Sequence, residues 1–467
     1  MTEARLAVMD TADGYEWTHP VLFLRAVGGV FIEVEDRVAW HTRALSFMMA
    51  LFWGNLIRRV LSSVLVIAIL GAILGLVHKR AFAVDKGIQE LEQHRSLWPS
   101  TLYGALRVEK SGGPIGFTYD LHKPETIQVF VTAQALVALF HKPSQSQDKP
   151  KIQALLQYME ANHQERYREP SGLWVIDPGW SYFGFESAPT ISEVSAWVAL
   201  AKIRVAEEKN GMLTSQERNQ LVESIRRDLD ELKARANQTD GGWSVLRVAP
   251  LEVRTYSTLM ALWAFVEARN SPEVLNRIPS FDVDYGQTIR DGLNWLIRHH
   301  DPTIGWVPNP SRTGQTVRVP GLEAQALFVL NNAAHQYDYL RADPGYLVIR
   351  QQFLDRFANV NIKDLTPWYT FLSDQDQYVH YNDPNNVRQS ISIEGMRFFS
   401  YSWLLADVAY LAKDQGLSPQ YRQLAENKRS EMLLMADDAV KEAESCCTYE
   451  LAENLIGISY ALELIQH

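Results

Sequence analysis

The feature that most constrains this chain is a long-period repeat of apolar segments rich in small residues. Segment 132–139 reads Thr-Ala-Gln-Ala-Leu-Val-Ala-Leu, and segment 323–330 reads Glu-Ala-Gln-Ala-Leu-Phe-Val-Leu. Segments that begin at 193, 255, 394 and 453 fit the same frame, so the repeat recurs about every 60–70 residues. A period of that length accommodates two helices and their connections.

Amphipathic segments lie between these apolar ones. The clearest is segment 216–236, in which Leu221, Ile225, Leu229 and Leu232 form one apolar stripe among charged residues. A helix that is apolar all round is buried, whereas an amphipathic helix faces water on one side. The alternation therefore predicts an all-α fold over residues 85–467, an (α/α)6 toroid of six helical hairpins with inner and outer helix rings.

The turns after the amphipathic segments repeat a glycine–tryptophan pattern: Gly172-Leu-Trp174, Gly241-Gly-Trp243 and Gly305-Trp306. Glycine permits the positive φ that such turns need. Segment 238–243, Gln-Thr-Asp-Gly-Gly-Trp, followed by Tyr256-Ser-Thr258, resembles the Gln-Trp repeat of squalene-hopene-type cyclases. The resemblance to this terpenoid cyclase and protein prenyltransferase superfamily covers roughly residues 85–467 and implies the toroid fold.

The catalytic motifs of that superfamily are not matched. Class II cyclases use an Asp-x-Asp-Asp motif, and the nearest counterpart here is Asp282-Val-Asp284-Tyr285. The prenyltransferases hold zinc with Asp, Cys and His, but the two cysteines of this chain are adjacent at 446 and 447, and no Asp-x-Cys occurs. We therefore expect no metal site and no cofactor.

Acidic residues recur at the starts of the predicted inner helices. In the repeat frame the first positions are Thr132, Glu193, Thr255, Glu323, Glu394 and Glu453. If the ring closes, these positions converge on one end of a central cavity, where crowded carboxylates raise one another's pKa. Such a cluster can supply an acid and a base, or bind a ligand. The simpler alternative is that each glutamate stabilises its own helix N-terminus, where anions are favoured.

Aromatic residues are expected beside these acids. The candidate cavity-lining residues, besides the acids and Thr255, are Trp180, Trp243, Tyr256, Trp306, Tyr378 and His380. Two long connections, 178–189 and 364–390, carry several of them. Long aromatic-rich connections are usually ordered and functional, so these are expected either to form a lid or to plug the ring.

A separate apolar run precedes the predicted toroid. Residues 60–77 carry no charge and are bracketed by Arg58, Arg59, Lys79 and Arg80. This pattern predicts one transmembrane helix within segment 44–80, after a mixed acidic segment 1–43. The lipid bilayer is then a partner, with the toroid expected on the cytoplasmic side. The Gly71-x-x-x-Gly75 spacing permits a homo-oligomer through this helix.

Charge narrows the classes of function. The net charge is −10 and no basic stripe occurs, which argues against nucleic acid as a partner. Because the fold signal is clear and the catalytic motifs are absent, the first expectation is a membrane-anchored, non-catalytic module that binds an unidentified small molecule or protein. The alternative is a membrane-tethered enzyme, a hydrolase or cyclase-like protein on a glycan- or lipid-linked substrate, with two inner-helix glutamates as acid and base.

Overall fold

The computed structural model describes residues 56–108, 115–119, 121, 127–140, 149–169, 171–181, 188–208, 211–237, 240–247, 253–310, 318–365, 369–371, 378–382, 388–392, 397–444 and 447–466. The chain divides into two units, Met1–Phe82 and Ala83–His467. Helix α2 (Leu56–Gly104) runs across that division. The second unit is mostly helical and contains the ring described below.

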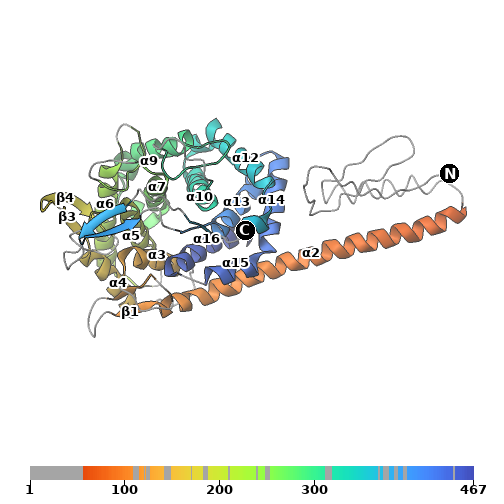
Figure 1. Cartoon of the computed structure of the whole chain (residues 1–467), viewed down its shortest axis with the longest axis horizontal. Helices are drawn as coiled ribbons and strands as arrows, with labels where there is room; N and C mark the ends of the chain where they lie inside the picture. The colour runs from red at the N-terminus through yellow and green to blue at the C-terminus, as the bar shows by residue number, and fades with distance from the viewer. Residues whose placement is uncertain are drawn as a thin grey trace. The chain divides into compact units, whose positions relative to one another are not determined.

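An inner ring of helices forms the centre of the second unit (Figure 1). Its members are α3 (Val129–Phe140), α5 (Ser192–Ala206), α7 (Thr255–Asn270), α10 (Pro320–Gln336), α13 (Tyr401–Lys413) and α16 (Thr448–Gln466). Each contacts the next in chain order, and α16 contacts α3, so the ring closes. Nearly all of their residues are buried, as expected for helices that are apolar on every face.

Backbone hydrogen bonds repeat around this ring. The first N–H groups of α5, α7 and α16 donate to the carbonyl oxygens of Val245, Pro308 and Tyr119, at 3.0, 3.1 and 2.8 Å. Each acceptor lies in the turn before another inner helix, and the third bond joins the last inner helix to the turn before the first. These bonds satisfy N–H groups that have no partner within their own helix.

The outer helices are amphipathic. They are α4 (Lys149–Ala161), α6 (Ser215–Arg235), α9 (Phe281–Arg298), α12 (Pro344–Ala358), α14 (Pro419–Leu433) and α15 (Ala436–Ala443). Helix α6 begins with a capping box between Thr214 and Glu217 and buries Ile225, Leu229 and Leu232. Short helical turns, α8 (Pro272–Leu275), α11 (Asp338–Arg341) and η1 (Ile362–Leu365), complete the described helices.

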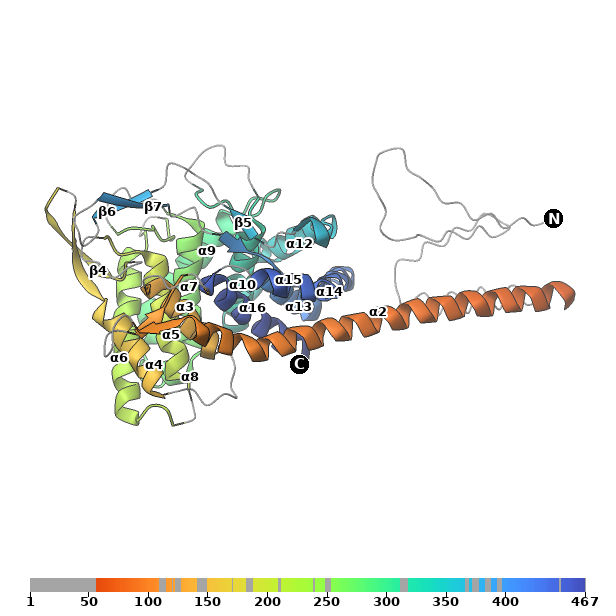
Figure 2. The ribbon, with the colours of Figure 1, turned by 60° about the horizontal axis from the view of Figure 1, so that its bottom comes forward.

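Within the described residues, four two-stranded antiparallel ribbons accompany the helices. They are β1 (Leu106–Val108) with β2 (Ile115–Phe117), β3 (Gln164–Arg168) with β4 (Trp174–Gly179), β5 (Tyr369–Phe371) with β8 (Arg397–Phe399), and β6 (Tyr378–Asn382) with β7 (Arg388–Ser392). Figure 2 shows β4, β6 and β7 on the same side of the ring. Strands β5 and β8 contact α10, so part of the long connection before α13 lies against the inner ring.

A tryptophan joins each of three outer helices to the turn that follows it. The indole N–H groups of Trp180, Trp243 and Trp306 donate to carbonyl oxygens in the last turns of α4, α6 and α9, at 2.8, 2.7 and 2.8 Å. Carbonyl oxygens in the last turn of a helix accept no hydrogen bond from within that helix. In the first of these turns, Gly179 (φ +136°) and Trp180 take the role that the sequence pattern assigned to Gly172 and Trp174. Trp174 instead lies on β4 with 46% of its surface exposed.

The expected membrane location is contradicted. Among the residues that the structure describes, no helix combines the length and the apolar character needed to cross a membrane. Segment 60–77 belongs to helix α2, and its side chains at 60–70, 73 and 77 are outside the described residues. We therefore propose no membrane anchor for this protein.

Candidate active site

Glu193 is the most unusual of the predicted acids. It is the second residue of α5 and only 1% exposed. Its Oε1 accepts a hydrogen bond from the Ser257 hydroxyl at 2.7 Å, while Oε2 is buried without a partner. Burial raises the pKa of Glu193, and the charges of Arg254 and Arg235 only partly oppose this. The arrangement favours a protonated carboxyl with one oxygen free to donate.

Glu453 lies among amide groups. It is the sixth residue of α16 and 4% exposed, and its two oxygens accept from Gln134 Nε2 at 2.9 Å and Gln325 Nε2 at 2.8 Å. Burial raises the pKa of Glu453 to about 8. The two glutamines come from α3 and α10, so this carboxyl joins three inner helices across the ring.

Glu323 is paired with arginines. It is the fourth residue of α10 and 1% exposed. Its oxygens lie 3.1 Å from Arg318 Nε and 3.1 Å from Arg356 Nε. Two guanidinium groups therefore hold a negative charge at this position. Arg318 belongs to the segment before α10, whereas Arg356 comes from the outer helix α12.

The glutamates do not occupy equivalent positions. Glu193, Glu323 and Glu453 are the second, fourth and sixth residues of their helices, which spreads them over about 6 Å of helix rise. The fourth position of α3, α5 and α7 carries a hydroxyl, on Thr132, Ser195 and Thr258. The hydroxyls of Thr132 and Thr258 accept from the backbone N–H of Phe117 and Trp243, both at 2.9 Å, and that of Ser195 accepts from Trp180 at 3.4 Å. The acidic ring is therefore staggered along the axis.

The other predicted lining residues have varied surroundings. Thr255 is buried and donates to the carbonyl of Val307 at 2.6 Å. Tyr256, the second residue of α7, accepts from the Trp197 indole at 3.4 Å. Trp180, Trp243 and Trp306 fill the seams between hairpins, as described above. Tyr378 and His380 lie on β6 with side chains outside the described residues, and Glu394 lies wholly outside them.

A second polar network crosses the ring at the other ends of the inner helices. Glu267 Oε1 accepts from Trp263 at 3.0 Å, Tyr460 at 2.8 Å and Asn332 at 2.7 Å, and Arg204 donates to Oε2 at 2.5 Å. Four of these five residues are the thirteenth of their helices, α5, α7, α10 and α16. These four inner helices therefore run in the same direction, and the carboxyl group of Glu267, whose two oxygens both accept hydrogen bonds, joins them.

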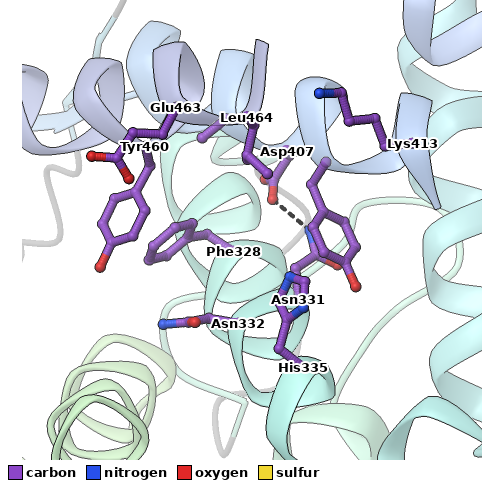
Figure 3. A pocket seen from close by; sticks show the side chains of 11 residues that line it. Phe328, Asn331, Asn332, His335, Asp407, Lys413, Tyr460, Glu463 and Leu464 are labelled. Atoms are coloured by element: carbon purple, nitrogen blue, oxygen red, sulfur yellow. Dashed lines mark hydrogen bonds between the residues drawn. The ribbon is translucent and has the colours of Figure 1, made fainter. Parts of the chain in front are cut away.

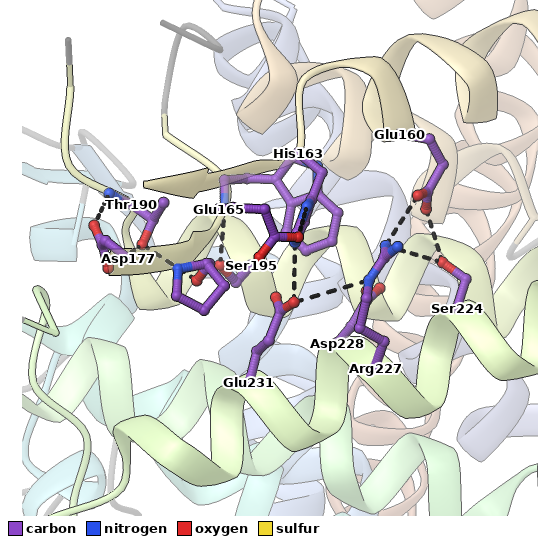
Figure 4. A network of polar contacts seen from close by, with 12 residues as sticks. Glu160, His163, Glu165, Asp177, Thr190, Ser195, Ser224, Arg227, Asp228 and Glu231 are labelled. Carbon is purple, nitrogen blue, oxygen red and sulfur yellow. Dashed lines mark hydrogen bonds and ion pairs between the residues drawn. The ribbon is translucent and has the colours of Figure 1, made fainter. Parts of the chain in front are cut away.

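A charged cluster between α4, α5 and α6 is also structural (Figure 4). Lys202 on α5 is fully buried and lies 2.6 Å from Asp228 Oδ2, with Glu160 as a second ion-pair partner. Its ammonium group also lies 4.5 Å from the centre of the Trp180 ring. Arg227 pairs with Glu160 at 2.9 Å. The cluster joins an inner helix to two outer ones and contains no unpaired charge among these residues.

Sequence reasoning missed the glutamines that hold Glu453. Gln134 and Gln325 lie in the Ala-Gln-Ala-Leu stretch that the two most similar repeats share, and this shared polar residue in an apolar helix was the available signal. Arg356 could not be found in this way because it lies 33 residues from its partner Glu323. Within the described ranges, no group of three or more His, Cys, Asp or Glu residues could hold a metal ion.

Neither family models nor curated proteins match this sequence. Solved structures do show a likeness. An α-1,6-mannanase of glycoside hydrolase family 76 from Salegentibacter sp. covers 80% of this chain and 99% of its own, with 11% identity and a TM-score of 0.49. A D-mannose isomerase covers 79% and 96%, with 11% identity and a TM-score of 0.49. A cellobiose 2-epimerase from Bacillus thermoamylovorans covers 77% and 86%, with 11% identity and a TM-score of 0.46.

These comparisons bear on two predictions. The similar structures are α/α toroids of six hairpins, and a relation to the terpenoid cyclases is not shown. They are named as enzymes that act on sugars, which contradicts the predicted non-catalytic binding module. Identity near 11% leaves the reaction and the substrate of this chain to be argued from its own residues.

Proposed function

We propose that this protein is an enzyme that acts on a sugar or glycan, with buried glutamates of the inner ring supplying an acid and a carboxylate. The observation that carries the proposal is Glu193. It is a buried carboxyl on an inner helix, with a raised pKa and one oxygen that has no partner. A carboxyl whose pKa is raised holds its proton to higher pH than usual and can donate it to a leaving oxygen or to a ring oxygen.

The surroundings of Glu193 favour the role of proton donor. Ser257 occupies only Oε1, so Oε2 keeps the capacity to donate. Tyr256 lies at the same helical position of the neighbouring inner helix, so an aromatic ring is close to the start of α5. Aromatic rings beside carboxyls are suited to binding the apolar faces of sugars.

Glu323 is our candidate for the second carboxylate. Both glutamates are buried, but Glu323 is paired with Arg318 and Arg356, whereas Glu193 is bonded to Ser257 and has one oxygen without a partner. Pairs of carboxyls whose environments favour different protonation states are the usual equipment of acid–base catalysis on sugars. Glu453, with both oxygens accepting from amides, is assigned a structural role in the centre of the ring.

The test is turnover of a small panel taken from the names of the similar structures. Purified full-length protein is incubated with α-1,6-mannotriose, cellobiose and mannose, and products are separated by anion-exchange chromatography. We expect one of these to be hydrolysed, epimerised or isomerised. The variant Glu193→Gln should then lose about 10²- to 10⁴-fold in kcat, the contribution of a general acid.

The matched control is Glu223→Gln, the same change at an exposed position on α6. It should leave turnover unchanged. Full activity of Glu193→Gln, with folding verified by circular dichroism, would refute the assigned acid. Absence of turnover across the panel, together with no detectable sugar binding by calorimetry, would refute the proposed class of substrate.

A further inference from the structure

A cavity of about 330 Å³ lies at the C-terminal ends of three inner helices, α10, α13 and α16 (Figure 3). It is therefore at the opposite end of these helices from Glu323 and Glu453. Its wall includes the rings of Phe328, Tyr410 and Tyr460 together with Asn331 and Asp407. Its size is at the small end of the range for ligand pockets.

Asp407 lines this cavity and has one oxygen without a hydrogen-bond partner. The side chain is 1% exposed, and Oδ1 accepts from Asn331 Nδ2 at 2.8 Å. The amide oxygen of Asn331 in turn accepts from the Tyr346 hydroxyl at 2.7 Å, which fixes the direction of the amide. Asp407 Oδ2 is buried and has no hydrogen-bond partner. A buried polar atom without a partner is costly, so a ligand that pairs with it gains affinity.

The charges around the cavity favour a neutral ligand. Burial raises the pKa of Asp407 well above its ordinary value, which favours the protonated form. Because Oδ1 accepts from Asn331, the position for that hydrogen is Oδ2. Lys413 and Glu463 are exposed lining residues of opposite charge. Burial, with the nearby charge of Arg341, lowers the pKa of His335, so its ring is neutral at pH 7. The wall therefore offers aromatic surface and, at Asp407, a buried carboxyl with one oxygen that has no partner.

We propose that this cavity binds a small uncharged molecule with a mainly apolar body and one hydroxyl or carbonyl oxygen, which pairs with Asp407 Oδ2. The rings of Phe328 and Tyr460 pack 4.8 Å apart, centre to centre, and supply the apolar wall. Asn331 positions the acid through Oδ1 and leaves Oδ2 for the ligand. This site is separate from the proposed active site, and its existence does not depend on the proposed reaction.

The experiment compares three probes of nearly equal size on the full-length protein: benzyl alcohol, toluene and benzylamine. Dissociation constants are measured by ligand-observed NMR titration at pH 7. Benzyl alcohol should bind roughly 2- to 10-fold more tightly than toluene, the ratio that one hydrogen bond supplies. Benzylamine should bind more weakly than benzyl alcohol, because placing its charge against the buried Asp407 costs solvation and the lining carboxyl of Glu463 is exposed to water.

Variants assign the preference to Asp407. Asp407→Leu should abolish the advantage of benzyl alcohol over toluene, whereas Glu463→Gln, a change of charge at an exposed lining residue, should retain it. Asp407→Asn keeps a donor at the free position and should also retain it. Equal binding of benzyl alcohol and toluene by the parent, or tighter binding of benzylamine, overturns the proposal without any variant. Retention of the preference by a folded Asp407→Leu also overturns it.

Discussion

Replacing Glu453 by glutamine is expected to make the protein more stable than the parent at neutral pH and nearly equal to it at pH 5. Burial raises the pKa of this carboxyl from the ordinary 4.5 to about 8 in the folded protein. The folded state thus binds the proton more tightly than the unfolded state does. Stability from this group is fully present below pH 4.5 and is lost as the pH rises towards 8.

The magnitude follows from the interval between the two pKa values. Each pH unit above 4.5 costs the parent about 1.4 kcal/mol, which gives about 3 kcal/mol by pH 7. Glutamine is neutral in both states and avoids this loss. Its amide group can donate to Oε1 of Gln134 or of Gln325, since both oxygens are buried without a partner and either amide can turn over.

The assay is urea unfolding of parent and Glu453→Gln at pH 5, 6, 7 and 8, followed by tryptophan fluorescence. As the pH rises from 5 to 8, the urea concentration at the unfolding midpoint of the parent should fall relative to that of the variant. Glu223→Gln, an exposed glutamate on α6, is the matched control and should follow the parent throughout. A variant less stable than the parent at pH 7 by the same amount as at pH 5 would refute the reasoning, since it would mean that the folded ring requires the carboxylate.

Three further stability predictions follow from packing and charge, each measured by the same urea unfolding. Lys202→Met should cost about 1.5–3 kcal/mol, the range for a hydrogen bond to a charged group, because it leaves the buried Asp228 with Arg227 alone at 3.2 Å. Lys202→Met with Asp228→Leu should recover most of the loss. On α9, Gly286→Ala should stabilise the protein by about 0.5–1 kcal/mol, because a methyl group there meets no atom within 4 Å. In contrast, Gly292→Ala on the same helix should destabilise it by about 1–3 kcal/mol, because its methyl group would lie 2.6 Å from the Trp243 ring. Trp243→Phe should cost about 1–2 kcal/mol through the lost bond to the last turn of α6, and a cost near zero would show that this bond contributes nothing.

The helical alternation is a local property of the sequence, and it could be predicted. Segment 216–236 carries an apolar stripe at helical spacing, and the structure places α6 there with Ile225 and Leu229 buried. The repeats that begin at 132 and 323 lie in the inner helices α3 and α10. The register within each helix was less accessible, because the helix starts depend on where each turn ends.

The turns, too, could be predicted only in part from the sequence. Both Trp174 and Trp180 come shortly after a glycine, but only Trp180 donates to a carbonyl in the last turn of the preceding outer helix. Strands β3 and β4 pair as a ribbon, in which Trp174 lies opposite Arg168 and away from that carbonyl. A pattern of glycine and tryptophan alone does not distinguish the two positions.

The sequence by itself determined the alternation of buried and amphipathic helices and the period that closes them into a ring, because both depend on the spacing of apolar residues along one chain. Only the tertiary structure decided which polar groups meet inside that ring. Glu453 accepts hydrogen bonds from glutamines on α3 and α10, and Glu323 accepts them from an arginine on α12. Asp407 accepts one from an asparagine on α10 and lines a cavity. The protonation of these acids depends on such distant partners and on burial, which helical spacing does not specify.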